Sequence, residues 1–271
     1  MFLEHERHGA VAVVTLANPP VNALSLALRR ALQEFFSAVR SDAEAGAIVV
    51  HGAGRGFCAG GDRSEFGTPD ANARPTLSRD VLDAIERCGK PVVAALHGYA
   101  VGGGFELALA CSARVAVADT QVALPEVTIG VFPLSATQRL PRILGLERAA
   151  ELMLSGTRVN ASDPRVAGCF EVFVPDAAAL LPAALACARE LIRAPVAPVR
   201  LRPIPGDPTN ELRRVLARHP PSARSPAAHA LLLAFEAAVN GKDFQAGLDE
   251  AQRLFDELGG NQRPSPPIQA H

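Results

Sequence analysis

Short apolar runs alternate with amphipathic stretches along the first 120 residues of the chain. The stretch behind Ser25 carries apolar residues at every third or fourth position from Leu28 to Val39, which predicts a capped helix. Further helices are expected around residues 81–88 and from Gly102 to about Ser112. Four almost entirely apolar runs predict strands that are covered on both faces: 11–16, 47–50, 91–96 and 114–118. This alternation predicts an α/β fold with a largely parallel sheet.

The strand pattern stops after about residue 175. Proline and arginine concentrate between Arg193 and Pro226, which predicts a loop-rich connection. Two helices are expected to follow, the second with an apolar stripe from Phe244 to Leu258. We therefore expect three parts: an α/β core over 1–200, a helical C-terminal region over 201–258, and a polar, proline-rich, disordered tail over 259–271.

Composition narrows the functional classes. A net charge of −1, no Trp and one Tyr give no indication of a nucleic-acid or membrane partner. No apolar run reaches the roughly 18 residues of a membrane helix, and the first seven residues carry acids where a signal peptide carries bases, so we expect a cytoplasmic protein. Five scattered cysteines without a C-x-x-C pair predict buried free thiols, and neither a disulfide framework nor a metal site.

The segment Gly102-Gly103-Gly104-Phe105-Glu106 joins a predicted strand to a predicted helix. Glycines there let a ligand approach the backbone, and the N–H groups at a helix N-terminus stabilise a developing oxyanion. Glu106 lies on the same side of the helix as Gly103, and its apolar neighbours predict a raised pKa. The alternative interpretation is a glycine-rich turn with Glu106 as a solvated first-turn acid.

Glu126 is a second carboxylate among apolar neighbours. Two such acids on separate elements are typical of general acid/base chemistry on one substrate. The alternative is a loop acid that pairs with a nearby arginine such as Arg139.

The loop from Gly56 to Asp62 follows a predicted strand and could supply a second backbone N–H donor. Residues Gly54 to Ala59 also match the dinucleotide fingerprint G-x-G-x-x-A. That fingerprint needs a helix to open there and an acid beyond the next strand, whereas more glycines and Pro69 follow, so this interpretation is disfavoured. Cys58 has no histidine nearby in sequence, and a small core residue is the better interpretation.

Together these segments resemble the enoyl-CoA hydratase/isomerase (crotonase) superfamily. The matching stretches, in a fixed order, are Asn18–Leu24, Gly56–Asp62, Lys90–Cys111, Leu124–Glu126, Thr137–Gly145 and Leu154–Gly156. The C-terminal stretch around Phe235–Ala238 and Phe244–Phe255 is similar to the end of the hydratase half of multifunctional fatty-acid β-oxidation enzymes.

The resemblance implies a crotonase (ClpP-like) spiral of ββα units with a C-terminal helical region. It also implies a homo-oligomer, either a trimer or a dimer of trimers, and an acyl-CoA substrate whose thioester oxygen sits between the N–H groups of Gly61 and Gly103. The coenzyme A portion would pack near Ala23, Ala59 and Asp62. Coenzyme A is part of the substrate, and no metal or separate cofactor is implied.

The activity that the resemblance implies is hydration of a 2-enoyl-CoA. Glu126 would handle the proton delivered at Cα, and Glu106 would assist the attacking water. The presence of both glutamates favours a hydratase over an isomerase, since isomerases typically use one carboxylate. Enoyl-CoA isomerisation, or another crotonase-type reaction, is the alternative.

One loop departs from the family pattern. After Glu126 the family usually has a glycine-rich stretch, and this chain has Pro133-Leu-Ser-Ala136 instead. Phe132 and Leu134 are expected to line and narrow the acyl pocket, or the loop displaces Glu126. A displacement near 1 Å can cost about 100-fold in rate. A non-catalytic acyl-CoA-binding protein is therefore a third hypothesis.

Overall fold

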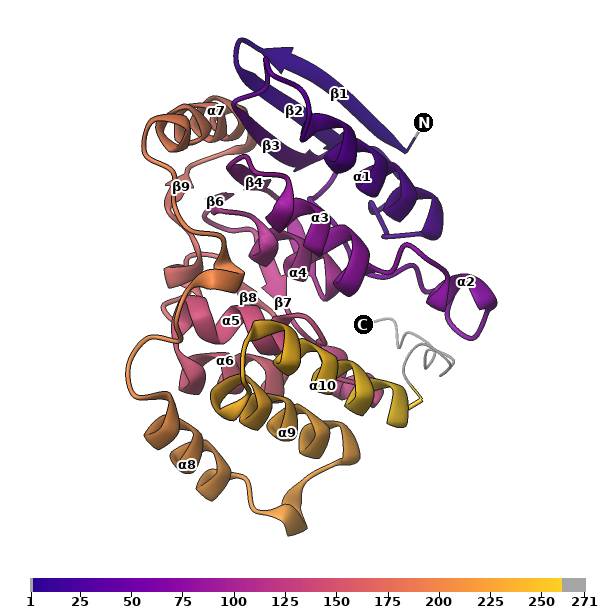
Figure 1. Ribbon diagram of the computed structural model, residues 1–271, viewed down its shortest axis with the longest axis vertical. Coiled ribbons are helices and arrows are strands. Elements are labelled where there is room, and N and C mark those ends of the chain that lie inside the picture. Colours follow the sequence, from indigo (N-terminus) through magenta and orange to yellow (C-terminus); the bar gives the residue numbers. More distant parts are fainter. Residues whose placement is uncertain (1, 260–271) are drawn as a thin grey trace.

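A six-stranded sheet of order β1-β2-β3-β4-β6-β9 forms one end of the molecule in the computed structural model, which describes residues 2–259 (Figure 1). All neighbours in this sheet are parallel except β1 and β2. A second sheet has the order β5-β7-β8. The strands are β1 Leu3–His8, β2 Val11–Leu16, β3 Ala47–Gly52, β4 Val92–Leu96, β5 Tyr99–Val101, β6 Ala113–Val117, β7 Gln121–Ala123, β8 Val159–Asn160 and β9 Val172–Val174.

The central strands are mostly apolar, with His51 in β3 and Arg114 in β6 as exceptions, because helices cover both faces of the large sheet. Val13 and Val49 belong to the core that α7 completes, whereas Val14 and Val50 belong to the core that α1, α3 and α4 complete. The four strands expected from apolar runs are confirmed, with bounds shifted by a residue or two. The helices are α1 Leu26–Val39, α2 Pro69–Asn72, α3 Leu82–Arg87, α4 Gly103–Ala110, α5 Ala136–Leu144, α6 Leu146–Ser155, α7 Ala177–Arg193, α8 Pro208–Arg218, α9 Pro226–Asn240 and α10 Phe244–Glu257.

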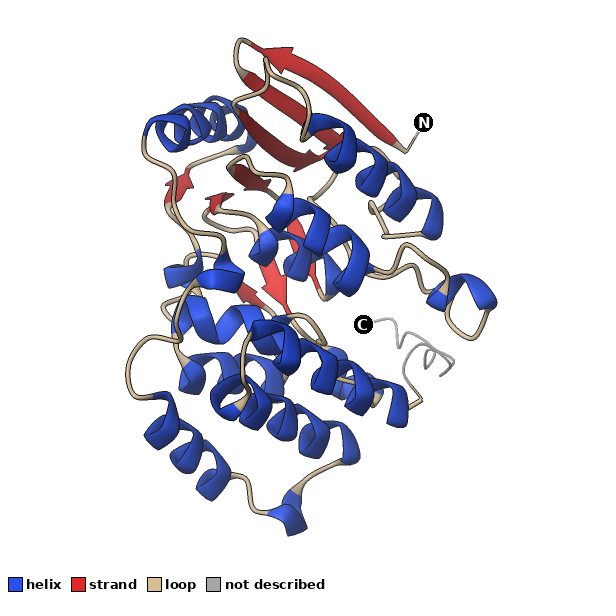
Figure 2. Ribbon diagram, in the orientation of Figure 1, coloured by secondary structure: helices blue, strands red, loops and turns tan. Residues whose placement is uncertain are grey.

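The other end of the molecule is helical, with α5, α6, α8, α9 and α10 gathered together (Figure 2). The expected helices α9 and α10 are confirmed. The loop-rich connection expected between Arg193 and Pro226 is wrong in its centre, where α8 forms. Pro208 occupies the first turn of α8, where its missing N–H costs nothing, and Asp207 caps the Asn210 N–H at 3.1 Å. The expected tail lies outside the described residues, apart from Gly259.

Short and exposed strands were not anticipated. β1 is an edge strand with mostly exposed polar residues, so it lacks an apolar run. β5, β7, β8 and β9 have two or three residues each, too few for a periodicity. No helix among residues 2–259 is long and apolar enough to cross a membrane.

Candidate active site

The two candidate acids converge because β5 and β7 are neighbours. These strands pair in parallel with Val101 opposite Ala123, so their carboxyl ends meet at one edge of the small sheet. Gly102, directly after β5, donates its N–H to the Ala123 carbonyl at 2.8 Å. From this edge α4 carries Glu106, and a 3₁₀ turn over Glu126–Ile129 carries Glu126. The pairing of β5 with β7 thus brings Glu106 and Glu126, twenty positions apart in the chain, to the same edge of the sheet.

A cavity of about 190 Å³ lies between these elements and α10. Seven of the expected site residues line it: Gly61, Asp62, Gly103, Glu106, Glu126, Phe132 and Leu134. Ala23 directly precedes the lining residue Leu24 and Ala59 lies two residues before the lining residue Gly61, and neither alanine lines the cavity itself. Their contact with coenzyme A stays a prediction.

The three glycines after β5 bring the backbone close to the cavity. A methyl group at Gly102 would lie 2.7 Å from Glu126 Oε1, and one at Gly103 would lie 2.8 Å from Leu77 Cδ2 and 3.7 Å from the Gly61 nitrogen. Gly102 also has φ +53°, which side chains rarely adopt. Gly103 is the first residue of α4, so its N–H has no acceptor within the helix. The backbone nitrogens of Gly61 and Gly103 therefore share one wall of the cavity.

Glu106 is buried, with 6% of its surface exposed, so it is not the solvated acid of the alternative interpretation. Its Oε1 accepts a hydrogen bond from the Ala136 N–H at 2.8 Å. Ala136 begins α5, so the N-terminus of that helix faces the carboxylate. Burial raises the pKa of Glu106, opposed by the Ala136 N–H, the Ser135 hydroxyl and the charge of Arg139. The loop that departs from the family pattern thus supplies the donor for Glu106.

Glu126 has a different environment. The residue is partly exposed as a whole, but its Oε2 is buried and has no hydrogen-bond partner among the described residues. Burial and the neighbouring Glu106 raise the pKa of Glu126 to about 8. The Ala136 N–H and the charge of Arg139 oppose the rise of the pKa at Glu106, whereas Glu126 Oε2 has no hydrogen-bond donor among the described residues, so the two carboxyls differ in environment.

Arg139 does not pair with Glu126. Its Nη2 donates to Glu86 Oε2 at 2.6 Å, and both side chains are almost inaccessible, at 1% and 0% exposure. The Phe244 ring, at the start of α10, lies 5.1 Å from the Arg139 guanidinium carbon, 5.1 Å from that of Arg142 and 5.5 Å from that of Arg200. α5 therefore contacts Glu106 with its first residue and anchors α10 with Arg139.

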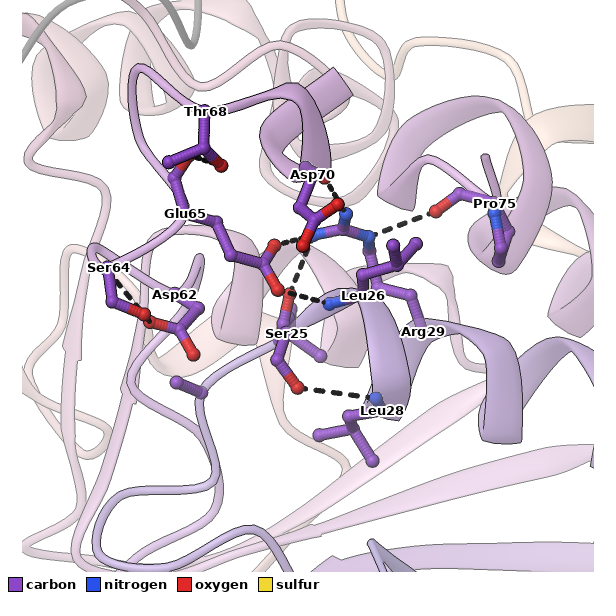
Figure 3. A network of polar contacts seen from close by, with 12 residues as sticks. Ser25, Leu26, Leu28, Arg29, Asp62, Ser64, Glu65, Thr68, Asp70 and Pro75 are labelled. Atoms are coloured by element: carbon purple, nitrogen blue, oxygen red, sulfur yellow. Dashed lines mark hydrogen bonds and ion pairs between the residues drawn. The ribbon is translucent and has the colours of Figure 1, made fainter. Parts of the chain in front are cut away.

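A second buried arginine, Arg29, lines the cavity and lies at the centre of a network of polar contacts (Figure 3). Arg29 Nη1 donates to the Leu24 carbonyl at 2.8 Å and to Glu65 Oε2 at 3.1 Å. Its Nε donates to the Pro75 carbonyl at 2.9 Å, and its Nη2 to the Asp70 carbonyl at 2.7 Å. The segment from Glu65 to Pro75 is thereby fixed to α1.

Sequence reasoning missed Arg29, the Ala136 N–H and the α10 residues in the cavity. An arginine beside the apolar stripe of α1 is the only signal for Arg29, and a solvated helix face gives the same signal. A backbone N–H has no signal at all, since every residue except proline carries one. The dinucleotide interpretation is wrong, because no helix opens in residues 54–59 after β3.

Known proteins resemble the chain over much of its length. Residues 6–202 match the family described as enoyl-CoA hydratase/isomerase. A probable enoyl-CoA hydratase from Bacillus subtilis (strain 168) is 38% identical over 183 residues, which cover 66% of this chain and 71% of the relative. The peroxisomal bifunctional enzyme of Danio rerio is 46% identical over 155 residues, which cover 57% of this chain. The chain spans only 21% of that enzyme's length.

Two solved structures extend the similarity to the fold. The enoyl-CoA hydratase from Bacillus anthracis has 29% identity and a TM-score of 0.66, covering 94% of this chain and 90% of that one. A monofunctional enoyl-CoA isomerase from M. smegmatis has 25% identity and a TM-score of 0.60, covering 91% and 98%. The expected crotonase-type fold is confirmed.

Proposed function

Because the chain belongs to the enoyl-CoA hydratase/isomerase family, we propose that it adds water to the double bond of 2-enoyl-CoA thioesters. The observation that carries the proposal is one cavity lined by two carboxyls in different environments, one accepting from the Ala136 N–H and one without a donor at its Oε2 among the described residues, and by Gly61 and Gly103. Addition of water needs both a proton donor and a group that receives a proton from water. A pair that shares one proton supplies both.

The thioester oxygen is proposed to accept hydrogen bonds from the N–H groups of Gly61 and Gly103. When water attacks Cβ, electrons move through Cα and leave negative charge on this oxygen as an enolate. Two fixed donors stabilise that charge, and loss of one such donor costs about 3 kcal/mol in other enzymes. The α4 dipole, whose positive end is at Gly103, acts in the same direction.

The glutamates then divide the proton transfers. Ionised Glu106 accepts a proton from the attacking water, whose oxygen forms the new bond to Cβ. Protonated Glu126 gives its proton to Cα as the enolate collapses, which regenerates the thioester carbonyl. Both groups end with exchanged protonation states, and proton exchange with solvent restores the starting state. The product is a 3-hydroxyacyl-CoA.

An isomerase is the second candidate, favoured by the similarity to the M. smegmatis enoyl-CoA isomerase. Isomerisation moves one proton along the acyl chain and needs one carboxyl. In that case a 3-enoyl-CoA would be converted to a 2-enoyl-CoA by a protein that keeps activity after one of the two glutamates is replaced. A non-catalytic acyl-CoA-binding protein would bind either thioester without turnover.

The deciding experiment follows the 2-enoyl thioester absorbance of crotonyl-CoA with wild type, Glu106→Gln and Glu126→Gln. Hydration should be observed with wild type, and each substitution should lower kcat by roughly 10²- to 10⁴-fold. Glu257→Gln, an exposed carboxyl at the end of α10, is the matched control and should keep full activity. A wild-type protein that leaves crotonyl-CoA unchanged and isomerises a 3-enoyl-CoA would refute hydration.

Two further proposals concern the assembly and the location. We propose a trimer or a dimer of trimers, which size-exclusion chromatography with light scattering would establish. We also propose a cytoplasmic location, in line with the similarity to a bacterial relative, although the zebrafish relative is peroxisomal. Microscopy of the tagged full-length protein in its own cells would test it.

A further inference from the structure

The cavity differs between its rim and its interior. Asn72 at the rim is exposed and Asp62 is half-buried, whereas Leu134 and Phe132 are 8% and 0% exposed. A coenzyme A moiety is charged and far larger than the cavity, so it must extend over the polar rim. The acyl chain is apolar, and it therefore occupies the buried end, where it removes the most apolar surface from water.

Helix α10 borders the cavity with two partly buried residues. Gln252 and Phe255, one turn apart on the same face of α10, both line the cavity. The Phe255 ring meets the Phe132 ring edge to face, with 5.7 Å between the centroids and 83° between the planes. Two aromatic rings in this geometry form a rigid boundary, because the favourable arrangement is lost when either ring turns away.

The position of α10 is fixed from its other end. Phe244, the first residue of α10, lies among the guanidinium groups of Arg139, Arg142 and Arg200. Close to Phe244, Gly247 packs against the Gln138 side chain, and a side chain at this position would have to displace the Gln138 amide. α10 therefore acts as a fixed wall of the cavity.

We propose that Phe255 determines substrate specificity by ending the acyl pocket, so that the protein accepts short 2-enoyl chains and discriminates against long ones. This proposal rests on the proposed hydratase function. The cavity of about 190 Å³ is comparable with a known protein cavity of about 150 Å³ that holds one benzene molecule, which is room for an acyl group on the order of four to six carbons. Longer chains need the space that the Phe255 ring occupies.

The test compares crotonyl-CoA with 2-decenoyl-CoA in wild type, Phe255→Ala and Phe255→Leu. Wild type should favour crotonyl-CoA in kcat/KM. Phe255→Ala should raise the kcat/KM for 2-decenoyl-CoA relative to that for crotonyl-CoA by about 10-fold or more. Phe255→Leu should raise this ratio by less, because leucine leaves part of the space filled. Leu258→Ala is the control, since Leu258 packs on the same core directly after α10 without lining the cavity, and it should leave the ratio unchanged.

Binding separates this proposal from the proposed reaction. The affinities of the unreactive butanoyl-CoA and decanoyl-CoA can be measured by calorimetry. Wild type should bind the shorter thioester in preference, and Phe255→Ala should bind decanoyl-CoA more tightly relative to butanoyl-CoA, whether or not turnover occurs. An absence of hydration with this binding pattern would overturn the proposed function alone. Equal wild-type affinities for both chains, or an unchanged ratio in Phe255→Ala, would overturn the role of Phe255.

Discussion

Replacing Glu126 by glutamine should stabilise the fold while it lowers kcat. The Glu126 carboxyl has a pKa of about 8 in the folded chain, raised from an ordinary value of 4.5 by burial and by Glu106. Between these pH values the unfolded chain has released the Glu126 proton and the folded chain still holds it. Stability therefore falls as pH rises through this window, because the unfolded state binds fewer protons. Glutamine stays neutral at every pH and is free of this loss.

The magnitude follows from the shift. Each pH unit between 4.5 and about 8 costs the folded wild-type protein up to about 1.4 kcal/mol relative to a neutral side chain. The advantage of Glu126→Gln should thus be about 2 kcal/mol at pH 6 and about 4 kcal/mol at pH 8. Because Glu106 is coupled to Glu126, this difference includes the repulsion between the two carboxylates, which glutamine removes.

Urea unfolding of wild type and Glu126→Gln at pH 6 and pH 8 measures this difference directly. The midpoint of the variant should exceed that of wild type at both pH values, and the gap should widen at pH 8 at similar m-values. Glu257→Gln, whose carboxyl is exposed, should behave like wild type at both. A gap that stays constant with pH, or a variant that is less stable at pH 8, would refute the assignment of a neutral Glu126.

Three further outcomes are expected. Gly103→Ala places a methyl group 2.8 Å from Leu77 Cδ2 at the proposed thioester site, so steady-state kcat for crotonyl-CoA should fall about 10-fold or more with little change in urea midpoint. Glu86→Gln leaves the buried Arg139 charge without its partner, and urea unfolding should show a loss of about 3 kcal/mol, which a second substitution of Arg139 by methionine should largely restore. Arg29→Leu releases the loop that it holds, so limited proteolysis should cleave that loop faster and KM should rise more than kcat falls.

The sequence singled out both acids as candidates, since each lies among apolar residues and in a stretch that resembles the family. Their separate roles came from the resemblance alone, because residue types do not show which donors surround each carboxyl. The difference between Glu106 and Glu126 arises from the Ala136 N–H, whose position depends on how α5 packs against α4. The departure from the family pattern before Ala136 suggested a displaced Glu126, whereas the structure shows that segment in contact with Glu106.

The sequence predicts the elements in which buried residues form a long apolar run, and it does not predict the elements that are too short for such a run. β3 and β4 are apolar runs with helices on both sides, and each was expected. β5 and β7 decide where the acids meet, but three-residue strands have no readable period. Phe255 was expected in the apolar stripe of α10, yet periodicity cannot distinguish a residue that fills the core from one that borders a cavity. The expected trimer or dimer of trimers stays a prediction.

Gly102, Gly103 and Gly104 are required for three separate reasons. A side chain at Gly104 would overlap the Cys58 carbonyl, one at Gly103 would enter the proposed thioester site beside Leu77, and one at Gly102 would displace the Glu126 carboxyl. In a saturation library, substitutions at all three positions should therefore be depleted to a similar extent by a growth selection. They should separate once protein abundance and turnover are scored independently: substitutions at Gly104 should lower the amount of folded protein, and those at Gly103 the activity per molecule.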